Sequence, residues 1–265
     1  MSITPNTDAA EHAATVADQF TRQAAQFASS RALHNEAALK LLVEAAAPRA
    51  TDLALDVACG PGSVVAALAE RVARAEGIDA TPAMLEEAKT LAAAKGLTNV
   101  AWHLGNVEAL PFAAQCFDIV SCRFALHHFQ EPPRAFAEML RVCREGGRIV
   151  LCDGLAADDP AKAAAFNAME RFRDPSTVEF RTLAFLRGLF ALAGLPEPEA
   201  RFYGVPFDLE TMVARSFPLN DDRAGLRAML EASVEGDALG LGAHRKDGTA
   251  WFAYPAAVLV ARIGA

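Results

Sequence analysis

Short apolar runs alternate with amphipathic segments along the chain up to Asp153. Runs of this kind, without period-two alternation, are typical of strands that are buried on both faces. The clearest such run is residues 53–58, and further strands are expected at 74–80, 99–106, 117–125 and 147–153. Between them, hydrophobic residues recur at helical spacing, most clearly where Thr81 can cap a helix that begins at Pro82 and ends at Gly96. Strands that alternate with helices predict a parallel, doubly wound sheet.

The two flanks of this region differ from it in texture. Residues 8–48 are rich in Ala, Gln, Glu and Leu, and Pro48 ends the helical composition. After Asp153, we expect polar helical structure at 154–180, an amphipathic helix at 182–195 and two helical patches within 209–247. Two further strands are expected, at 199–207 and 249–263.

These elements predict an α/β fold, Rossmann-like and doubly wound, with a mostly parallel seven-stranded sheet and helices on both faces. Because no linker rich in Gly and Ser interrupts the chain, we expect residues 1–265 to form a single domain. Residues 1–48 would be an N-terminal helical cap, and residues 49–153 would be the core that binds the ligand. Residues 154–265 would supply helical lid insertions and the last strands of the sheet.

Composition narrows the function classes. The chain of 265 residues has a formal net charge of −8 and shows no basic run, which disfavours a nucleic-acid partner. No apolar stretch approaches the roughly 18 residues of a membrane span, and the polar N-terminus does not resemble a signal peptide, so we expect a cytoplasmic protein. The five cysteines form no C-x-x-C pair, so we expect reduced thiols and no metal site.

The clearest candidate for a binding site is the turn "CGPG" at residues 59–62, directly after the first strand. Ligands of open parallel sheets bind at the carboxyl ends of the strands, and glycine lets a ligand approach the backbone. Asp79 follows Gly60 by 19 positions and can accept both hydroxyls of a ribose. A dinucleotide fingerprint would need glycine where Val65 stands, and Asp56 suits a cationic group, so we expect a ligand without a pyrophosphate.

Several motifs in order along the chain carry a resemblance to a known family. "LDVACGPG", "GIDATPAML", "GNVEALPF", "FDIVSCRFALHHF" and "REGGRIVL" resemble the class I S-adenosylmethionine-dependent methyltransferases. Within that family they are most similar to the ubiquinone/menaquinone-type enzymes that act on small molecules. The resemblance covers residues 51–153 and implies S-adenosyl-L-methionine as cofactor and S-adenosyl-L-homocysteine as product.

The resemblance also assigns cofactor contacts near the glycine turn. Gly60 and Gly62 would lie against the amino-acid part of the cofactor, with Asp56 near its ammonium group. Asp79 would hold the ribose hydroxyls.

Further contacts follow along the next strands. Ala80 and Met84 would flank the adenine, and Asn106 with Val107 would occupy the position that reads its edge. The family usually has Asp where Asn106 stands, and Asn106 can equally be a turn residue after a glycine. Arg123, at the end of the fourth strand, would line the cofactor site.

Methyl transfer from a sulfonium is an in-line displacement that needs alignment and exclusion of water, and in some cases a base. His127 and His128 follow the fourth strand. We expect His127 to face the pocket as a candidate base and His128 to be packed, with the alternative that neither is catalytic. The remaining histidines are expected at the surface or in structural roles: His12, His34, His103 and His244.

Candidate substrate contacts come from both flanks. Phe20, Phe27 and Arg31 share a helix face that either reaches the substrate or only packs an apolar stripe. Arg171 or Arg173, in "RFRDPS", can pin an acidic or planar substrate, or belong to a solvated lid helix.

The sequence therefore predicts methyl transfer to a small aromatic or heterocyclic molecule, and leaves open whether the acceptor atom is C, N or O. One alternative is an enzyme of the same fold that binds the same cofactor but performs other chemistry, such as a cyclase or decarboxylase. A nucleotide-binding oxidoreductase is disfavoured by Val65. The expected partner is a small-molecule substrate, without nucleic acid or membrane span, and the oligomeric state is not predicted.

Overall fold

The computed structural model describes residues 7–29 and 36–264. Its core is one mixed sheet with the strand order β3-β2-β1-β4-β5-β8-β6, and a short β7 that pairs with β8. The strands are β1 (Leu53–Val57), β2 (Arg74–Asp79), β3 (Val100–Leu104), β4 (Phe117–Arg123), β5 (Cys143–Gly154), β6 (Glu199–Asp208), β7 (His244–Lys246) and β8 (Thr249–Arg262). The doubly wound α/β fold is therefore confirmed, and β7 is an addition that the helical composition of 209–247 concealed.

The strand order reverses direction next to β1, which pairs in parallel with both β2 and β4. Val57 lies opposite Ile78 on one side and Cys122 on the other, so the three strands end at one edge of the sheet. A reversal of this kind leaves a crevice at the carboxyl ends of the strands. β8 runs antiparallel to both β5 and β6.

Helices cover both faces of the sheet. They are α1 (Thr7–Ser29), α2 (Glu36–Ala46), α3 (Ser63–Ala69), α4 (Pro82–Ala94), α5 (Pro132–Val142), α6 (Pro160–Arg173), α7 (Leu183–Leu192), α8 (Leu209–Arg215) and α9 (Arg223–Ala232). Neighbouring residues of β1 serve opposite faces, since Ala54 packs with α2 and α3, and Leu55 packs in the core with α5 and α7. The N-terminal segment that was predicted to be helical contains two helices, α1 and α2.

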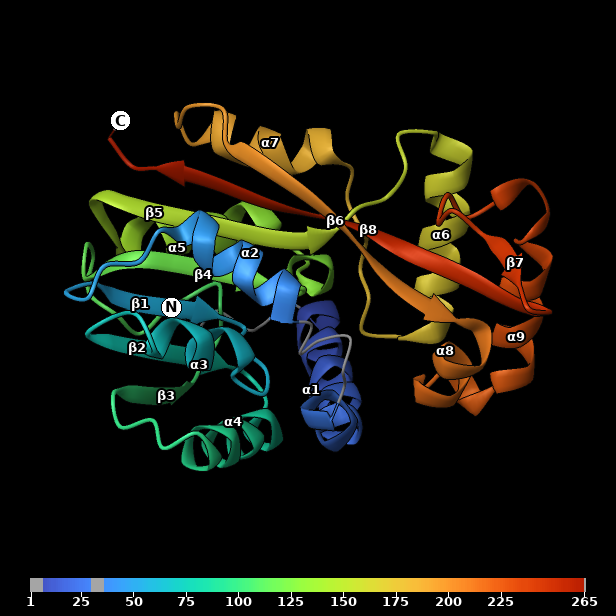
Figure 1. Ribbon diagram of the computed structural model, residues 1–265, viewed down its shortest axis with the longest axis horizontal. Helices are drawn as coiled ribbons and strands as arrows, with labels where there is room; N and C mark the ends of the chain where they lie inside the picture. Colours follow the sequence, from blue (N-terminus) through green and yellow to red (C-terminus); the bar gives the residue numbers. More distant parts are fainter. Residues whose placement is uncertain (1–6, 30–35, 265) are drawn as a thin grey trace.

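β6 and β8 extend past the rest of the sheet and carry a second apolar core (Figure 1). We call α6, α8, α9, β7 and the adjoining ends of β6 and β8 the distal region. Phe166, Phe207, Leu226 and Phe252 are among the residues buried there. Figure 1 shows α1 beyond the ends of the parallel strands, between the sheet and the distal region. No helix within the described residues is long and apolar enough to cross a membrane.

Candidate cofactor and acceptor pocket

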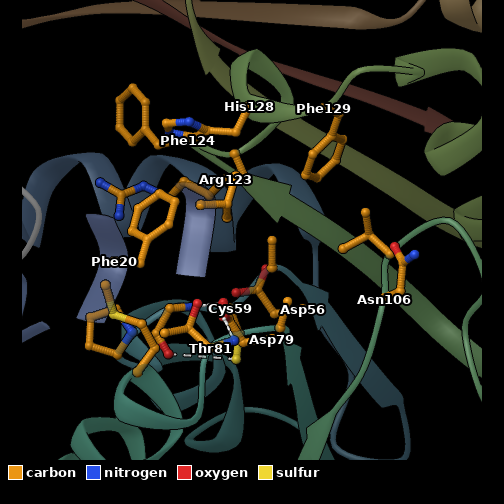
Figure 2. Close-up of a pocket in the computed structure, with 18 of the residues that line it drawn as sticks. Phe20, Asp56, Cys59, Asp79, Thr81, Asn106, Arg123, Phe124, His128 and Phe129 are labelled. Atoms are coloured by element: carbon orange, nitrogen blue, oxygen red, sulfur yellow. Dashed lines mark hydrogen bonds between the residues drawn. The ribbon is translucent and has the colours of Figure 1, made fainter. Parts of the chain in front are cut away.

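A cavity of about 350 Å³ lies at the carboxyl ends of β1, β2 and β4 (Figure 2). Its walls are the glycine turn after β1, the start of α4, the loop after β3, the segment after β4 and one side of α1. Among the described residues, none from 154–264 lines this cavity, and α1 covers it. That residues 154–265 supply a lid stays a prediction.

The two glycines of the turn have different roles. Gly60 has φ +50°, and a Cβ built on it would meet nothing within 4 Å, so this glycine faces open space in the cavity. A Cβ on Gly62 would lie 2.6 Å from Cη2 of Trp102 and 2.9 Å from Cβ of Ala88. Gly62 therefore permits close packing against β3 and α4 and is not among the lining residues of the cavity, so its contact with the cofactor stays a prediction.

Asp79 is held rigidly at the end of β2. Its Oδ2 accepts a hydrogen bond from the backbone N–H of Gly60, and its Oδ1 accepts one from that of Thr81, both at 2.8 Å. Burial raises the pKa of this carboxyl above its usual range, against the effect of these hydrogen bonds. The carboxylate both fixes the glycine turn and lines the cavity, where it is available to hydroxyl donors.

Asp56, on β1, is the more deeply buried carboxylate of the cavity, with 2% of its surface exposed. The Ser121 hydroxyl donates to its Oδ1 at 2.6 Å. Burial raises the pKa of Asp56 to about 7, although the hydrogen bond from Ser121 and the charge of Arg123 act in the opposite direction. A cationic ligand group beside it would offset the cost of burying this charge.

Apolar residues also line the cavity. They include Ala80 and Met84, which follow Asp79 in the sequence, and Val107, which follows Asn106. The Oδ1 of Asn106 accepts a hydrogen bond from the backbone N–H of Glu108 at 2.9 Å. Asn106 is thus a turn residue and a lining residue at once, so the structure combines the two interpretations that the sequence left open.

An aromatic wall forms the other end of the cavity. Phe20 from α1, Phe124 and Phe129 line it, and Figure 2 shows them around the ring of His128. Phe124 has φ +50°, an uncommon conformation for a residue with a side chain, and its N–H donates to the carbonyl of Cys152 at 2.8 Å. The guanidinium carbon of Arg123 lies 4.9 Å from the centre of the Phe124 ring, at the boundary between the wall and the carboxylates.

The histidine pair is oriented opposite to the prediction. His127 turns away from the cavity because Asp153 accepts from its backbone N–H at 3.2 Å and contacts its Nδ1 at 2.7 Å. Its ring stacks on Phe180 with the centroids 3.9 Å apart. His128 lines the cavity instead. The two residues belong to one short 3-10 helix, Leu126–His128, and their rings lie next to each other with the centroids 4.1 Å apart, but of the two only His128 lines the cavity.

The remaining candidate residues fall into three groups. Arg173 is partly buried against Glu170, with the nearest N–O distance 2.8 Å, and Arg171 donates to the carbonyl of Val178. Neither arginine lines the cavity, so a substrate contact by either one stays a prediction. Phe27 lies on α1, where its side chain is outside what the structure describes, and Arg31 lies outside the described residues.

The prediction missed the contribution of α1. His12, expected at the surface, lines the cavity, and its Nε2 donates to the carbonyl of His128 at 2.8 Å. Val16 and Phe20 follow it at intervals of four and line the cavity as well. The helical spacing of these residues was the signal available in the sequence.

The fold and this cavity define a Rossmann-like transferase site, and the comparisons identify its class. Residues 55–151 match the family described as "Methyltransferase domain". The "Uncharacterized methyltransferase YcgJ" of Bacillus subtilis is 32% identical over 196 residues, which are 74% of this chain and 78% of that protein. The chain belongs to the class I S-adenosylmethionine-dependent methyltransferases, and S-adenosyl-L-methionine is its cofactor.

Solved structures and a further sequence relative agree with the assignment to this family. The crystal structure of YcgJ covers 86% of this chain and 98% of its own, with a TM-score of 0.79 and 28% identity. The C-methyltransferase UbiE of Dinoroseobacter shibae is 34% identical over 124 residues, which are 46% of this chain and 50% of that protein. The [4+2]-cyclase SpnF shares the fold, with a TM-score of 0.58 at 18% identity, and covers 85% of this chain and 79% of its own.

Proposed function

We propose that the protein transfers a methyl group from S-adenosyl-L-methionine to a small aromatic or heterocyclic molecule. The observation that supports this most is the division of one cavity into a carboxylate end and an aromatic end. The cofactor carries a cationic amino group and a ribose, which suit the carboxylates, and a flat acceptor suits the aromatic wall.

The proposed cofactor contacts follow this division. Asp56 would face the ammonium group, and Asp79 would accept from the ribose hydroxyls. Gly60 would let the amino-acid part approach the backbone, because nothing within 4 Å occupies the direction of its missing side chain. The apolar pair Ala80 and Met84 would flank the adenine.

Three further residues complete the proposed cofactor site. Asn106 and Val107 would line the edge of the adenine, since both belong to the loop that closes this side of the cavity. Arg123 would lie between the cofactor and the acceptor.

The charged residues of the cavity also indicate which charge the acceptor molecule should have. Asp56, Asp79 and Glu108 line it, and Arg123 is the cation among its described lining residues. An acidic acceptor would meet this excess of carboxylates, so a neutral molecule fits better. The bound cofactor supplies the methyl group of a sulfonium; the chain aligns the acceptor through Phe20, Phe124 and Phe129, and α1 excludes water.

The same proposal includes the subgroup within the family and the type of acceptor that it implies. The shared motifs and the match to UbiE support an acceptor of the quinone-precursor type, although that match covers half of UbiE. The likeness to SpnF, a cyclase, keeps other chemistry on this fold as the alternative outcome of the experiment.

Two measurements test the proposal. Calorimetric titration should show binding of S-adenosyl-L-homocysteine and none of NAD. The protein is then incubated with small-molecule extracts and cofactor that carries an isotope-labelled methyl group, and products are analysed by mass spectrometry. A product that gains one labelled methyl group supports methyl transfer. A converted substrate without the label would indicate the alternative chemistry, and binding of NAD instead would overturn the proposed cofactor site.

A further inference from the structure

A chain of buried polar side chains runs from α1 to His128, behind the aromatic wall. Nε2 of Gln23 donates to Oδ2 of Asp174 at 3.0 Å. The Ser176 hydroxyl donates to Oδ1 of the same carboxylate. Nδ1 of His128 lies 3.0 Å from the carbonyl oxygen of Ser176 and 3.1 Å from its hydroxyl. Asp174 and Ser176 belong to the "RFRDPS" segment, whose arginines turn away from the cavity.

This arrangement determines which nitrogen of His128 carries the proton. A carbonyl oxygen only accepts hydrogen bonds, so Nδ1 must be the donor. The Ser176 hydroxyl uses its own proton on Asp174, so its oxygen accepts from Nδ1 too. Burial opposes the charge on Asp174, but the charge of Arg173 and the hydrogen bonds from Gln23 and Ser176 lower its pKa, so the carboxylate remains an acceptor near pH 7. In a neutral imidazole with Nδ1–H, Nε2 keeps its lone pair.

The unprotonated nitrogen is accessible from the cavity. His128 lines the cavity, and Ser176, which holds its Nδ1, does not. Within the described part of the chain, Nε2 makes no hydrogen bond and is also not one of the fully buried polar atoms without a partner. Figure 2 shows the ring beside Phe20 and Phe124, at the acceptor end.

The charge state of the ring is set by its surroundings. His127 and Asp153 face it from one side, Asp174 from another, and His12 contacts its carbonyl. Burial, together with the neighbouring His127, lowers the pKa of His128 to about 3, so the ring is neutral near pH 7.

We propose that Nε2 of His128 accepts a hydrogen bond from an O–H or N–H group of the substrate, and that Asp174 and Ser176 are positioning residues that fix this tautomer. This rests on the proposed function and narrows the acceptor class to molecules with a hydroxyl or N–H at the methylated position. The hydrogen bond turns a lone pair of the acceptor atom toward the methyl group.

The chemical step balances with the groups present. The acceptor atom forms a bond to the methyl carbon as the carbon–sulfur bond breaks, and that electron pair stays on sulfur as a neutral thioether. The acceptor atom's proton passes to Nε2 and from there to water, because an imidazolium is unfavourable at this buried site.

The first test measures the tautomer directly and needs no substrate. Nitrogen-15 NMR of histidine-labelled protein separates protonated from unprotonated ring nitrogens, and the signals missing in His128→Gln assign this ring. We expect a neutral ring with protonated Nδ1 between pH 5 and pH 8. Asp174→Asn and Ser176→Ala should shift these signals, whereas Ser233→Ala, another buried serine bonded to a carbonyl, should not. Protonated Nε2 at pH 7 in the parent protein would overturn the proposal.

The second test asks whether Nε2 accepts from a ligand. With S-adenosyl-L-homocysteine bound, 2-naphthol should shift the Nε2 signal, and its methyl ether, which lacks the donor, should not. We expect the protein to prefer the naphthol by about threefold to tenfold, the range of one neutral hydrogen bond. Equal effects of the two probes, or none from the naphthol, would contradict the proposal.

Two variants distinguish a role of His128 Nε2 as a hydrogen-bond acceptor from a merely structural role of this residue. In His128→Gln the amide oxygen can take the place of Nε2, and in His128→Asn the amide can replace only Nδ1–H. Acceptance by Nε2 predicts that Gln retains the preference for naphthol and Asn loses it, and a merely structural role predicts the reverse. Failure of the proposed function can be distinguished from failure of this proposal. In the first case the parent protein would not bind S-adenosyl-L-homocysteine, although the tautomer of His128 would be as expected.

Discussion

The cofactor half of the molecule and the distal region are built on the same sheet but in different ways. In the first, parallel strands end together at β1, β2 and β4 and leave buried carboxylates beside open space. In the second, the long antiparallel pair β6 and β8 is wrapped by helices over an apolar core. The cavity takes no lining residue from the described part of the distal region.

The comparison indicates that the two halves contribute differently to binding and to stability. The free space and the buried carboxylates Asp56 and Asp79 lie where the parallel strands end, whereas the antiparallel extension fills its own interior. One link between the halves is the segment after α6, where Asp174 and Ser176 contact Gln23 and His128. We therefore expect substitutions in the distal core to change stability, and substitutions at the strand ends to change binding.

The largest expected effect is on stability, from Phe252→Ala. Phe252 lies on β8 with 1% of its surface exposed and stacks on Phe207. Truncation of a buried phenylalanine costs about 3–5 kcal/mol of unfolding free energy. Denaturant titration should show this loss, and the folded fraction should bind S-adenosyl-L-homocysteine with unchanged affinity. The control is Phe202→Ala on β6, where the ring is 58% exposed and little stability should be lost.

The next prediction compares the two glycines of the turn at residues 59–62. Gly60→Val should reduce affinity for S-adenosyl-L-homocysteine by about 100-fold or more, because the side chain enters the cavity and φ +50° is unfavourable for valine. Gly62→Ala should instead lower stability, because its Cβ would meet Trp102 at 2.6 Å. Calorimetric titration and thermal unfolding of both variants distinguish the roles. Normal binding by folded Gly60→Val would mean that the turn is only a connection.

These contrasts show what the sequence could and could not predict. The parallel strands and the glycine turn were predictable because their signals are local: an apolar run, a turn and an acidic residue at the end of the next strand. Asp79 occupies the predicted place for this reason. The spacing alone did not separate the roles of Gly60 and Gly62, since the difference depends on Trp102, 40 positions further along the chain from Gly62.

The orientation of the histidines also depends on residues far along the chain. His127 is turned by Asp153 on β5, and His128 by Ser176 after α6. Likewise, His12 enters the cavity only because α1 docks across the strand ends. Such contacts follow from tertiary packing, which neither hydrophobic period nor motif spacing encodes.

A smaller effect concerns the ribose contact. Asp79→Ala should weaken binding of S-adenosyl-L-homocysteine by about 10- to 100-fold, since a hydrogen bond to a charged acceptor contributes about 1.5–3 kcal/mol. Asp79→Asn should lose less, because the amide oxygen still accepts from the N–H of Gly60 or Thr81. Calorimetric titration of both variants provides the measurement. An unchanged dissociation constant in Asp79→Ala would remove this residue from the proposed ribose site.

The smallest expected effect is a pH dependence that belongs only to the cofactor half. Burial raises the pKa of Asp56 to about 7 in the protein without cofactor. A bound ammonium group favours the ionised carboxylate, so binding below that pH must release a proton. The affinity for S-adenosyl-L-homocysteine should therefore be constant above about pH 7 and fall below it, by at most about tenfold per pH unit.

The same carboxyl of Asp56 makes the stability of the protein without cofactor depend on pH in the opposite direction to the binding affinity. Its pKa is higher in the folded state than the ordinary value of 3.8, so the folded state binds more protons between the two values. Its contribution to stability is present at low pH and is lost as the pH rises toward 7. Asp56→Asn should flatten both profiles, which calorimetric titration and thermal unfolding across pH 5–8 can measure. Phe202→Ala, on β6 and outside the cavity lining, should keep both slopes, and slopes that persist in Asp56→Asn would assign the proton to another group.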